Sequence, residues 1–299
     1  MSDARPYVDQ RVVDLESARH VAQSAATAWG LAEPTLLRRG MNAIFVSGAE
    51  IVRVGRATAP AAASHDLAGL LEAHDIPVAT PVAGHTMDIE GFAVTGWERI
   101  HETGAAIDWA AVGAAVRRIH MIDSAGIPTN YPLPSPTTFP WWDFDAMLDA
   151  VADRIDPEAL DGLNRTIQAG RSWRTGVGHD AVVCHGDVHP GNVLMTADGP
   201  VLIDFDLLCH AAPAWDHAML TTVATRWGGG ADVYPAFALG YGRSLADDDL
   251  TTTIASLRNV AATLMRVRAG ITDDEALTEA ERRLRFWRGD PAAPQWLAQ

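Results

Sequence analysis

The first third of the chain begins with one helical pattern, after which the spacing of apolar residues shortens to that of strands. The predicted helix covers residues 14–30, where Asp14 suits the N-cap and Gly30 suits the end of the helix. Short strands separated by Gly-containing turns follow, and a small helix is expected at 62–73. The predicted strands are 35–40, 42–48, 50–56 and 91–100, and the Pro-containing stretch 76–82 is expected to be an edge or connecting segment.

The pattern becomes helical from Asp108, which is placed to cap a helix. The apolar residues that follow at steps of three or four form a single stripe, made of Trp109, Val112, Val116 and Ile119. Residues 126–140 contain five prolines and are expected to be irregular. Strand patterns return only briefly, around residues 181–206, and everything beyond Ala214 is helical in pattern.

A β-rich first third and a helical remainder predict a bilobal α+β fold. The N-lobe is expected at residues 1–97, as an antiparallel sheet with helices. The C-lobe is expected at residues 98–299, larger and mainly α-helical. The boundary is placed near Trp97 to Gly104, where the last predicted N-lobe strand runs into a linker.

Composition and charge exclude several kinds of chemistry. The 299 residues carry a formal net charge of −15, which argues against nucleic acid as a partner but permits a cationic small molecule. All 23 basic residues are arginine, which excludes lysine Schiff bases, lysine general bases and the P-loop lysine. Two cysteines are too few for a disulfide framework. The sequence has neither an apolar stretch of about 18 residues nor a signal-peptide pattern, so we expect a cytoplasmic protein without a membrane segment.

Ligand-type side chains are concentrated in one short part of the chain. The sequence CHGDVHPGN starts at Cys184, places Asp187 between two histidines and ends at Asn192. The sequence LIDFD then supplies Asp204 and Asp206. Carboxylates, imidazoles and an amide at this density indicate either a metal site or a phosphoryl-transfer site.

The spacing of Asn192 and Asp204 favours phosphoryl transfer. The intervening VLMTADGPVLI has two apolar stretches around ADG, a turn in which Gly199 can adopt φ > 0. A loop centred on Asp198 would place Asn192 opposite Asp204, about 4.5–5.5 Å away and with the side chains on one face. Asp206 would share that face. Oxygen ligands so placed suit Mg²⁺, which takes its remaining ligands from water and substrate phosphates.

Asp187 lies in the loop that leads into this hairpin, five residues before Asn192. It can therefore face the same space as the metal ligands. A carboxylate that holds or deprotonates an attacking hydroxyl beside a metal ion is the arrangement that phosphoryl transfer requires. The catalytic Asp and the metal-binding Asn of protein kinases have the same separation.

The pattern HGDVHPGN…LIDFD resembles the aminoglycoside phosphotransferase and choline kinase branch of the protein-kinase-like fold, in which His-Gly-Asp stands where protein kinases have His-Arg-Asp. The likeness extends over most of the chain. RRGMNAIFVSGAEIVRVGR is similar to the family's nucleotide loop and following strand, VTGWERI to its hinge, VRRIH to a C-lobe helix, and PAWDHA to the segment after the metal-binding aspartate. The resemblance implies that ATP and Mg²⁺ bind between the lobes and that a hydroxyl of a small molecule is phosphorylated.

Carried over residue by residue, the resemblance makes Asp187 the catalytic base or the group that orients the hydroxyl. It makes Asn192 and Asp204 the Mg²⁺ ligands. The implied nucleotide-binding residues are Arg53, Gly40, Asn42, Trp97 and Glu98. The implied supporting residues are His185, which would brace the loop, Asp206, which would assist the metal or lie behind it, and Asp216, which would hold the catalytic loop through hydrogen bonds.

Two positions depart from the family's pattern. Arg53 stands where the family usually offers a lysine to the α- and β-phosphates, and arginine can bind phosphate in a bidentate manner but is not equivalent to lysine. The small helix has no glutamate at the place that would pair with this residue, and Asp66 is expected to substitute for it. The phosphate clamp is therefore the part of the site in which this chain differs most from the family.

Two other functions remain open at this point. A pseudo-kinase would bind the nucleotide without turning it over, which the missing glutamate and Arg53 favour and the intact Asp187 opposes. A metal-dependent hydrolase would use His185, Asp187 and His189 as ligands, but it leaves the hairpin spacing unexplained. The acidic run 247–249 suits either a substrate amine or the dipole of a helix N-terminus.

Overall fold

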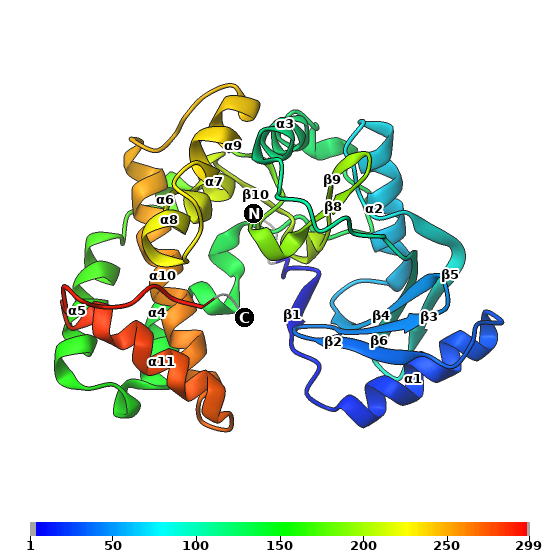
Figure 1. Cartoon of the computed structure of the whole chain (residues 1–299), viewed down its shortest axis with the longest axis horizontal. Helices are drawn as coiled ribbons and strands as arrows, with labels where there is room; N and C mark the ends of the chain where they lie inside the picture. Colours follow the sequence, from blue (N-terminus) through cyan, green and yellow to red (C-terminus); the bar gives the residue numbers. More distant parts are fainter. Residues whose placement is uncertain (1–3, 298–299) are drawn as a thin grey trace.

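The computed structural model describes residues 4–297 and consists of two lobes (Figure 1). The N-lobe is an antiparallel sheet with helix α1 on one side and helix α2 on the other. The C-lobe is mainly helical, and its few short strands lie near the junction of the two lobes. The predicted bilobal α+β fold is therefore confirmed.

The N-lobe sheet has six strands in the order β2-β3-β4-β6-β5, with β1 paired to β4. Its strands are β1 (Val8–Gln10), β2 (Thr35–Arg39), β3 (Ala43–Ser47), β4 (Glu50–Ala57), β5 (Pro81–Ile89) and β6 (Phe92–Glu98). The strand β1 was not predicted, because three residues are too few to show a period. Of the Pro-containing segment 76–82, predicted as an edge or connecting segment, residues 76–80 connect α2 to the sheet and residues 81–82 begin the edge strand β5. The rest of β5, which runs to Ile89, was not predicted.

The helices of the N-lobe form where their patterns predict them. α1 (Leu15–Ala28) starts at Asp14, whose Oδ1 accepts hydrogen bonds from the backbone amides of Glu16 and Ser17 at 3.0 and 3.1 Å. The chain leaves the helix through Gly30, whose φ of 71° suits glycine. The alanines and Val21 of α1 pack against the sheet, and α2 (Ala61–Ala73) packs near β5 and β6.

Nine α-helices, six short 3₁₀ turns and four short strands make up the described part of the C-lobe. The helices are α3 (Trp109–His120), α4 (Phe144–Asp149), α5 (Pro157–Ala169), α6 (Trp173–Gly176), α7 (Ala214–Thr221), α8 (Val223–Arg226), α9 (Val233–Tyr241), α10 (Asp249–Ala269) and α11 (Asp274–Trp287). The strands are β7 (Val182–Cys184), β8 (Val193–Thr196), β9 (Gly199–Leu202) and β10 (Cys209–Ala211). No helix within residues 4–297 is both long and apolar enough to cross a membrane.

Apolar packing joins the two lobes. One buried cluster contains Leu67 and Leu71 of α2, Ile119 of α3 and Val183 of β7. A second cluster fills the C-lobe around tryptophan side chains, including Trp142, Trp173 and Trp215. The first cluster thus holds an N-lobe helix against the strand that leads into the HGD loop (residues 185–192), which fixes that loop relative to the N-lobe sheet.

Candidate active site

The strands after the HGD loop form the predicted hairpin, but their register differs from the prediction by one residue. Leu194 of β8 lies opposite Val201 of β9, and Thr196 lies opposite Gly199, so the turn contains only two residues. Asn192 is consequently opposite Ile203, whose amide donates to the Asn192 carbonyl at 3.1 Å. The prediction that Asn192 directly faces Asp204 is wrong, because it assumed a three-residue turn.

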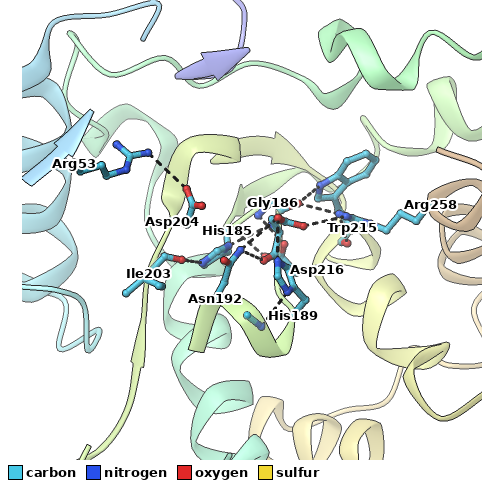
Figure 2. A network of polar contacts seen from close by, with 12 residues as sticks. Arg53, His185, Gly186, His189, Asn192, Ile203, Asp204, Trp215, Asp216 and Arg258 are labelled. Atoms are coloured by element: carbon cyan, nitrogen blue, oxygen red, sulfur yellow. Dashed lines mark hydrogen bonds and ion pairs between the residues drawn. The ribbon is translucent and has the colours of Figure 1, made fainter. Parts of the chain in front are cut away.

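Asp204 reaches the site in a different way. A shift of one residue along a strand turns a side chain to the opposite face, but Asp204 lies beyond the end of β9 with a left-handed backbone, at φ 65° and ψ 66°. This conformation is uncommon for a residue other than glycine and changes the direction of the side chain. Figure 2 shows the Asp204 carboxyl between Arg53 and the HGD loop.

The Asp204 carboxyl has one oxygen without a hydrogen-bond partner among residues 4–297. This oxygen, Oδ1, is shielded from solvent, and Nη2 of Arg53 lies 3.7 Å away. Burial and the nearby charge of Asp206 raise the pKa of Asp204 to about 7. A divalent cation would satisfy the unpaired oxygen and offset the repulsion between the two carboxylates. The residues present therefore fit a hard metal ion.

Asn192 provides the second predicted metal ligand. It ends the short 3₁₀ turn η5 (Pro190–Asn192) and is buried. Its Nδ2 donates to the backbone oxygen of Asp187 at 2.9 Å and to Oδ2 of Asp187 at 3.3 Å. This orientation directs the amide nitrogen to Asp187 and keeps the amide oxygen for a cation, so one side chain connects the predicted catalytic and metal-binding residues.

Asp187 is surrounded by groups that stabilise its ionised form. Nε2 of His189 lies 3.4 Å from Oδ2, Nη1 of Arg258 lies 3.7 Å from Oδ1, and about a third of the Asp187 side chain (34%) is exposed. Burial alone would raise the pKa of Asp187, but the charges of His189 and Arg258 hold it well below its usual range. The carboxylate is therefore ionised at neutral pH and open on one side to a ligand.

Arg258 is the site residue that sequence reasoning missed. It comes from the middle of α10, and its Nη2 donates to the backbone oxygens of Gly186 and Trp215 at 2.9 and 3.2 Å. Its guanidinium also lies over the Trp215 ring, 4.6 Å from the centroid. No local motif marks this arginine, because helices α7, α8 and α9 separate it from the HGD loop in the sequence.

The supporting roles expected of Asp216 and His185 agree with their contacts (Figure 2). Asp216 is buried, and its carboxylate accepts hydrogen bonds from the backbone amides of His185 and Gly186, both at 2.8 Å. Nε2 of His120 lies 3.0 Å from Oδ2 of Asp216, and His120 lowers the pKa of that carboxyl against the opposing effect of burial. Gly186 has φ 92°, and a Cβ at this position would overlap the Leu207 carbonyl. The loop therefore depends on glycine here and on the Asp216 carboxylate.

The predicted phosphate-binding residues Arg53 and Asn42 both contact Asp206. Arg53 forms an ion pair with Oδ2 of Asp206, and Nδ2 of Asn42 donates to the same oxygen at 2.8 Å. The expectation that Asp66 pairs with Arg53 is wrong, because Asp66 accepts a hydrogen bond from Asn130 at 2.8 Å instead. The N-lobe is thus connected through Asp206 to η6 (Phe205–Leu207), the turn that follows Asp204.

The remaining nucleotide-site predictions lie in the loop and hinge where they were expected. Gly40 begins the β2–β3 turn, and its amide donates to the Asn42 carbonyl at 2.8 Å. Trp97 and Glu98 end β6 at the start of the connection to the C-lobe, and Nε1 of Trp97 donates to the Thr95 hydroxyl at 2.8 Å. Their contacts with a nucleotide stay predictions.

The ligand set of the alternative hydrolase is not assembled. Both ring nitrogens of His185 are engaged, with Nε2 3.2 Å from the Ile203 carbonyl and Nδ1 accepting from the Asp187 amide at 3.3 Å. Across residues 4–297, the one group of three His, Cys, Asp or Glu side chains close enough to share a metal ion is His120, Cys184 and Asp216. In that group, both Asp216 oxygens already accept hydrogen bonds from the amides of His185 and Gly186. The group therefore supports the HGD loop.

Comparison with known proteins gives a family and a set of similar folds. The profile of the phosphotransferase enzyme family matches residues 42–258. No curated protein sequence matches the chain. Among solved structures, the amicoumacin kinase hAmiN in complex with AMP-PNP, Ca²⁺ and Ami has a TM-score of 0.66 and 13% identity, over 94% of this chain and 97% of that one.

Two further structures have the same fold. The choline/ethanolamine kinase family protein from Mesorhizobium loti has a TM-score of 0.63 and 16% identity, over 94% of this chain and 95% of that one. The aminoglycoside phosphotransferase APH(3'')-Id from Streptomyces rimosus has a TM-score of 0.61 and 22% identity, over 84% of this chain and 99% of that one. At these identities the likeness establishes the fold.

The two lobes, with an HGD loop, an amide and a left-handed aspartate at their junction, have the kinase-like fold of these solved structures. The match over residues 42–258 covers well over half of the chain, which therefore belongs to the phosphotransferase enzyme family. The resemblance to aminoglycoside phosphotransferases and choline kinases is confirmed. So is the prediction of a phosphotransferase.

Proposed function

We propose that the protein is an ATP- and Mg²⁺-dependent kinase that transfers the γ-phosphate to a hydroxyl of a small molecule. The nucleotide would bind between the N-lobe (residues 1–97) and the C-lobe (residues 98–299). The observation that carries the proposal is that three predicted site residues come together in one place. Asp187 is ionised and partly exposed, and Asn192 donates a hydrogen bond to it. The nearby Asp204 has a buried Oδ1 without a hydrogen-bond partner among residues 4–297.

Asp187 is assigned to the acceptor. A substrate hydroxyl would donate its hydrogen bond to this carboxylate, which Asn192 and Arg258 hold in one orientation. Because the pKa of Asp187 lies below its usual range, the carboxylate is a weak base before the reaction starts. Its main contribution is therefore to orient the hydroxyl toward the phosphorus, and it accepts the proton as the new P–O bond forms.

Asn192 and Asp204 are assigned to Mg²⁺. When bound, the ion would neutralise phosphate charge and hold the phosphates in position. Arg53 is assigned to the α- and β-phosphates, because a guanidinium makes charge-assisted and bidentate contacts with phosphate oxygens. Nucleotides in structures with this fold, such as ADP with spectinomycin in APH(9)-Ia and GDP with kanamycin in an APH(2") enzyme, support the nucleotide-dependent part of the proposal.

The charges near Asp187 constrain the acceptor. Arg258 supplies positive charge on one side of the carboxylate, so an ammonium group of the substrate would meet repulsion there. His189 lies on the other side, and its pKa is raised by Asp187 against the opposing effect of burial, which favours its protonated form. Asp248 in the acidic run is already used as the N-cap of α10, where Oδ2 accepts from the Thr251 amide at 2.8 Å. The helix role of that run is therefore preferred, and a cationic substrate would direct its charge away from Asp187.

The test is a substrate screen with the full chain. ATP consumption and product mass would be measured with Mg²⁺ against aminoglycosides, macrolides, hexosamines and choline, with EDTA as the control. We expect ADP release and a product heavier by one phosphate for one class of acceptor, both lost in EDTA. MgATP binding without a phosphorylated product from any class would instead favour the pseudo-kinase.

A further inference from the structure

Arg53 has its carboxylate partners in the opposite lobe. It lies on β4 of the N-lobe sheet, and its guanidinium reaches the turn η6 of the C-lobe, where it pairs with Oδ2 of Asp206. The Asp204 carboxylate is the second partner, with Nη2 of Arg53 3.7 Å from its Oδ1. The side chains of Arg53 and Asp206 are 15% and 10% exposed, so the pair is largely shielded from solvent.

The N-lobe helix offers no substitute for this partner. Protein kinases position the phosphate-binding residue of the sheet with a glutamate of the adjacent helix. Here the helix is α2, and its acidic residues are directed elsewhere: Asp66 accepts from Asn130, and Glu72 is exposed near the end of the helix. Across the described residues, the salt bridges of Arg53 are made with Asp204 and Asp206.

Asp206 is fixed from several N-lobe positions at once. Besides the ion pair, Oδ2 accepts a hydrogen bond from Nδ2 of Asn42 at 2.8 Å, and the backbone oxygen accepts from the amide of Tyr7 at 3.0 Å. Gly55 makes room for this contact, since a Cβ there would overlap Oδ1 of Asn42. The Asp206 side chain is held by Arg53 and Asn42 and its backbone by Tyr7, so it is a rigid anchor for the guanidinium.

We propose that Asp206 is the positioning residue of the phosphate clamp, and that it holds one edge of the Arg53 guanidinium while the other edge binds nucleotide phosphates. The inference rests on the proposed nucleotide-dependent function. A guanidinium suits this double role because it has five donors in a planar fork, whereas the ammonium of lysine is a single point of charge. The chain would then have arginine at position 53 because its carboxylate partner, Asp206, lies in the other lobe.

The alternative is that Asp206 is a third metal ligand, and the two roles respond differently to Mg²⁺. We would measure ADP affinity by calorimetry for wild type, Asp206→Asn, Arg53→Ala and the double variant, each with Mg²⁺ and with EDTA. We expect Asp206→Asn to weaken ADP binding about tenfold in both conditions, as expected for a lost charge-assisted contact. In the Arg53→Ala background the same change should have an effect of less than about twofold.

Additive losses in the double variant would overturn the proposal, and so would a loss that appears only with Mg²⁺. The exposed Asp198 of the β8–β9 turn provides a matched control, since Asp198→Asn removes the same charge at a distance from the clamp. If wild type binds no nucleotide, the proposed function fails together with this inference. If wild type binds ADP but the affinity losses of Asp206→Asn and Arg53→Ala add up in the double variant, the positioning role of Asp206 is wrong while the proposed function stands.

A second variant covers the case in which Asp206→Asn does not fold. Gly55→Ala leaves both charges of the pair in place but displaces the Asn42 amide from Asp206. We expect a smaller loss of ADP affinity, about threefold, in both Mg²⁺ and EDTA, because one of the contacts that fix the anchor is removed. Unchanged affinity in a folded Gly55→Ala protein, as judged by circular dichroism and thermal unfolding, would overturn the proposal.

Discussion

The guanidinium of Arg258 lies with Nη1 3.7 Å from Oδ1 of Asp187, while its Nη2 donates to the backbone oxygen of Gly186, the residue immediately before Asp187. One side chain of α10 therefore contacts both the carboxylate and the backbone that carries it. Its stacking over Trp215 fixes the guanidinium in turn. Arg258 thus restricts the position of Asp187 and stabilises its negative charge.

Arg258→Lys is expected to lower kcat at least about tenfold while leaving the KM for ATP nearly unchanged. Lysine keeps the positive charge but lacks the planar fork, so it cannot serve the two backbone oxygens and the carboxylate together. Steady-state kinetics with the identified acceptor would measure kcat and the KM for ATP separately. Arg268→Lys is the matched control, because Arg268 is an exposed arginine on the same helix. An unchanged kcat in Arg258→Lys would show that Arg258 has only a structural role.

Asp187→Asn is expected to lower kcat by about 10²–10⁴-fold, the usual contribution of a general base. The amide keeps the shape of the carboxylate but loses the charge that orients the hydroxyl and accepts its proton. ATP affinity should change little, since Asp187 is assigned to the acceptor. Single-turnover rates and calorimetry on the same preparation would separate the two effects. Wild-type turnover in this variant contradicts the assignment.

Asp204→Ala is expected to abolish the enhancement of nucleotide binding by Mg²⁺. The variant removes the carboxylate whose Oδ1 has no hydrogen-bond partner among residues 4–297. Asn192→Ala should weaken the same binding less, because a neutral amide attracts a dication less than a carboxylate does. It should also lower kcat, since Asn192 holds Asp187. ADP titrations with and without Mg²⁺ provide the measurement, and equal Mg²⁺ enhancement in wild type and Asp204→Ala would refute the metal assignment.

The sequence identified the parts of the site that are close together along the chain. Asp187, Asn192 and Asp204 lie within one loop and one hairpin, so a motif and a turn were sufficient to place them. The register of the hairpin was not determined, because ADG can form either a two-residue or a three-residue turn and only strand pairing decides between them. The left-handed backbone of Asp204 could not be foreseen either, since aspartate adopts it only in a particular tertiary setting.

Contacts between distant parts of the chain lay beyond sequence reasoning. Arg258 binds Gly186 across 72 residues, and Arg53 pairs with Asp206 across 153. Both arginines lie on regular elements whose periodicity predicts burial but names no partner. The absence of a glutamate at the pairing position of the small helix was visible in the sequence. The carboxylate that pairs with Arg53 instead became visible only when the two lobes were seen together.

The buried imidazole of His217 is expected to make stability depend on pH. His217 is fully buried on α7, with Nδ1 3.1 Å from the Tyr234 hydroxyl. Burial, assisted by the charge of His120, lowers its pKa from 6.5 to about 4. Between these values the unfolded chain binds a proton that the folded protein does not. The contribution of neutral His217 is therefore fully present above about pH 6.5, and a loss on the order of 3 kcal/mol is expected as the pH falls toward 4.

Denaturant unfolding of wild type and His217→Asn at pH 7.5, 6 and 4.5 would test this dependence. Asparagine can keep a hydrogen bond to the Tyr234 hydroxyl but does not titrate, so the difference in free energy of unfolding between the two proteins should shrink as the pH falls. His101→Asn is the control, because His101 is exposed and its removal should leave the pH dependence unchanged. A constant difference between wild type and His217→Asn at all three pH values would mean that His217 titrates alike in the folded and unfolded states. The acid sensitivity of the fold would then originate in other groups.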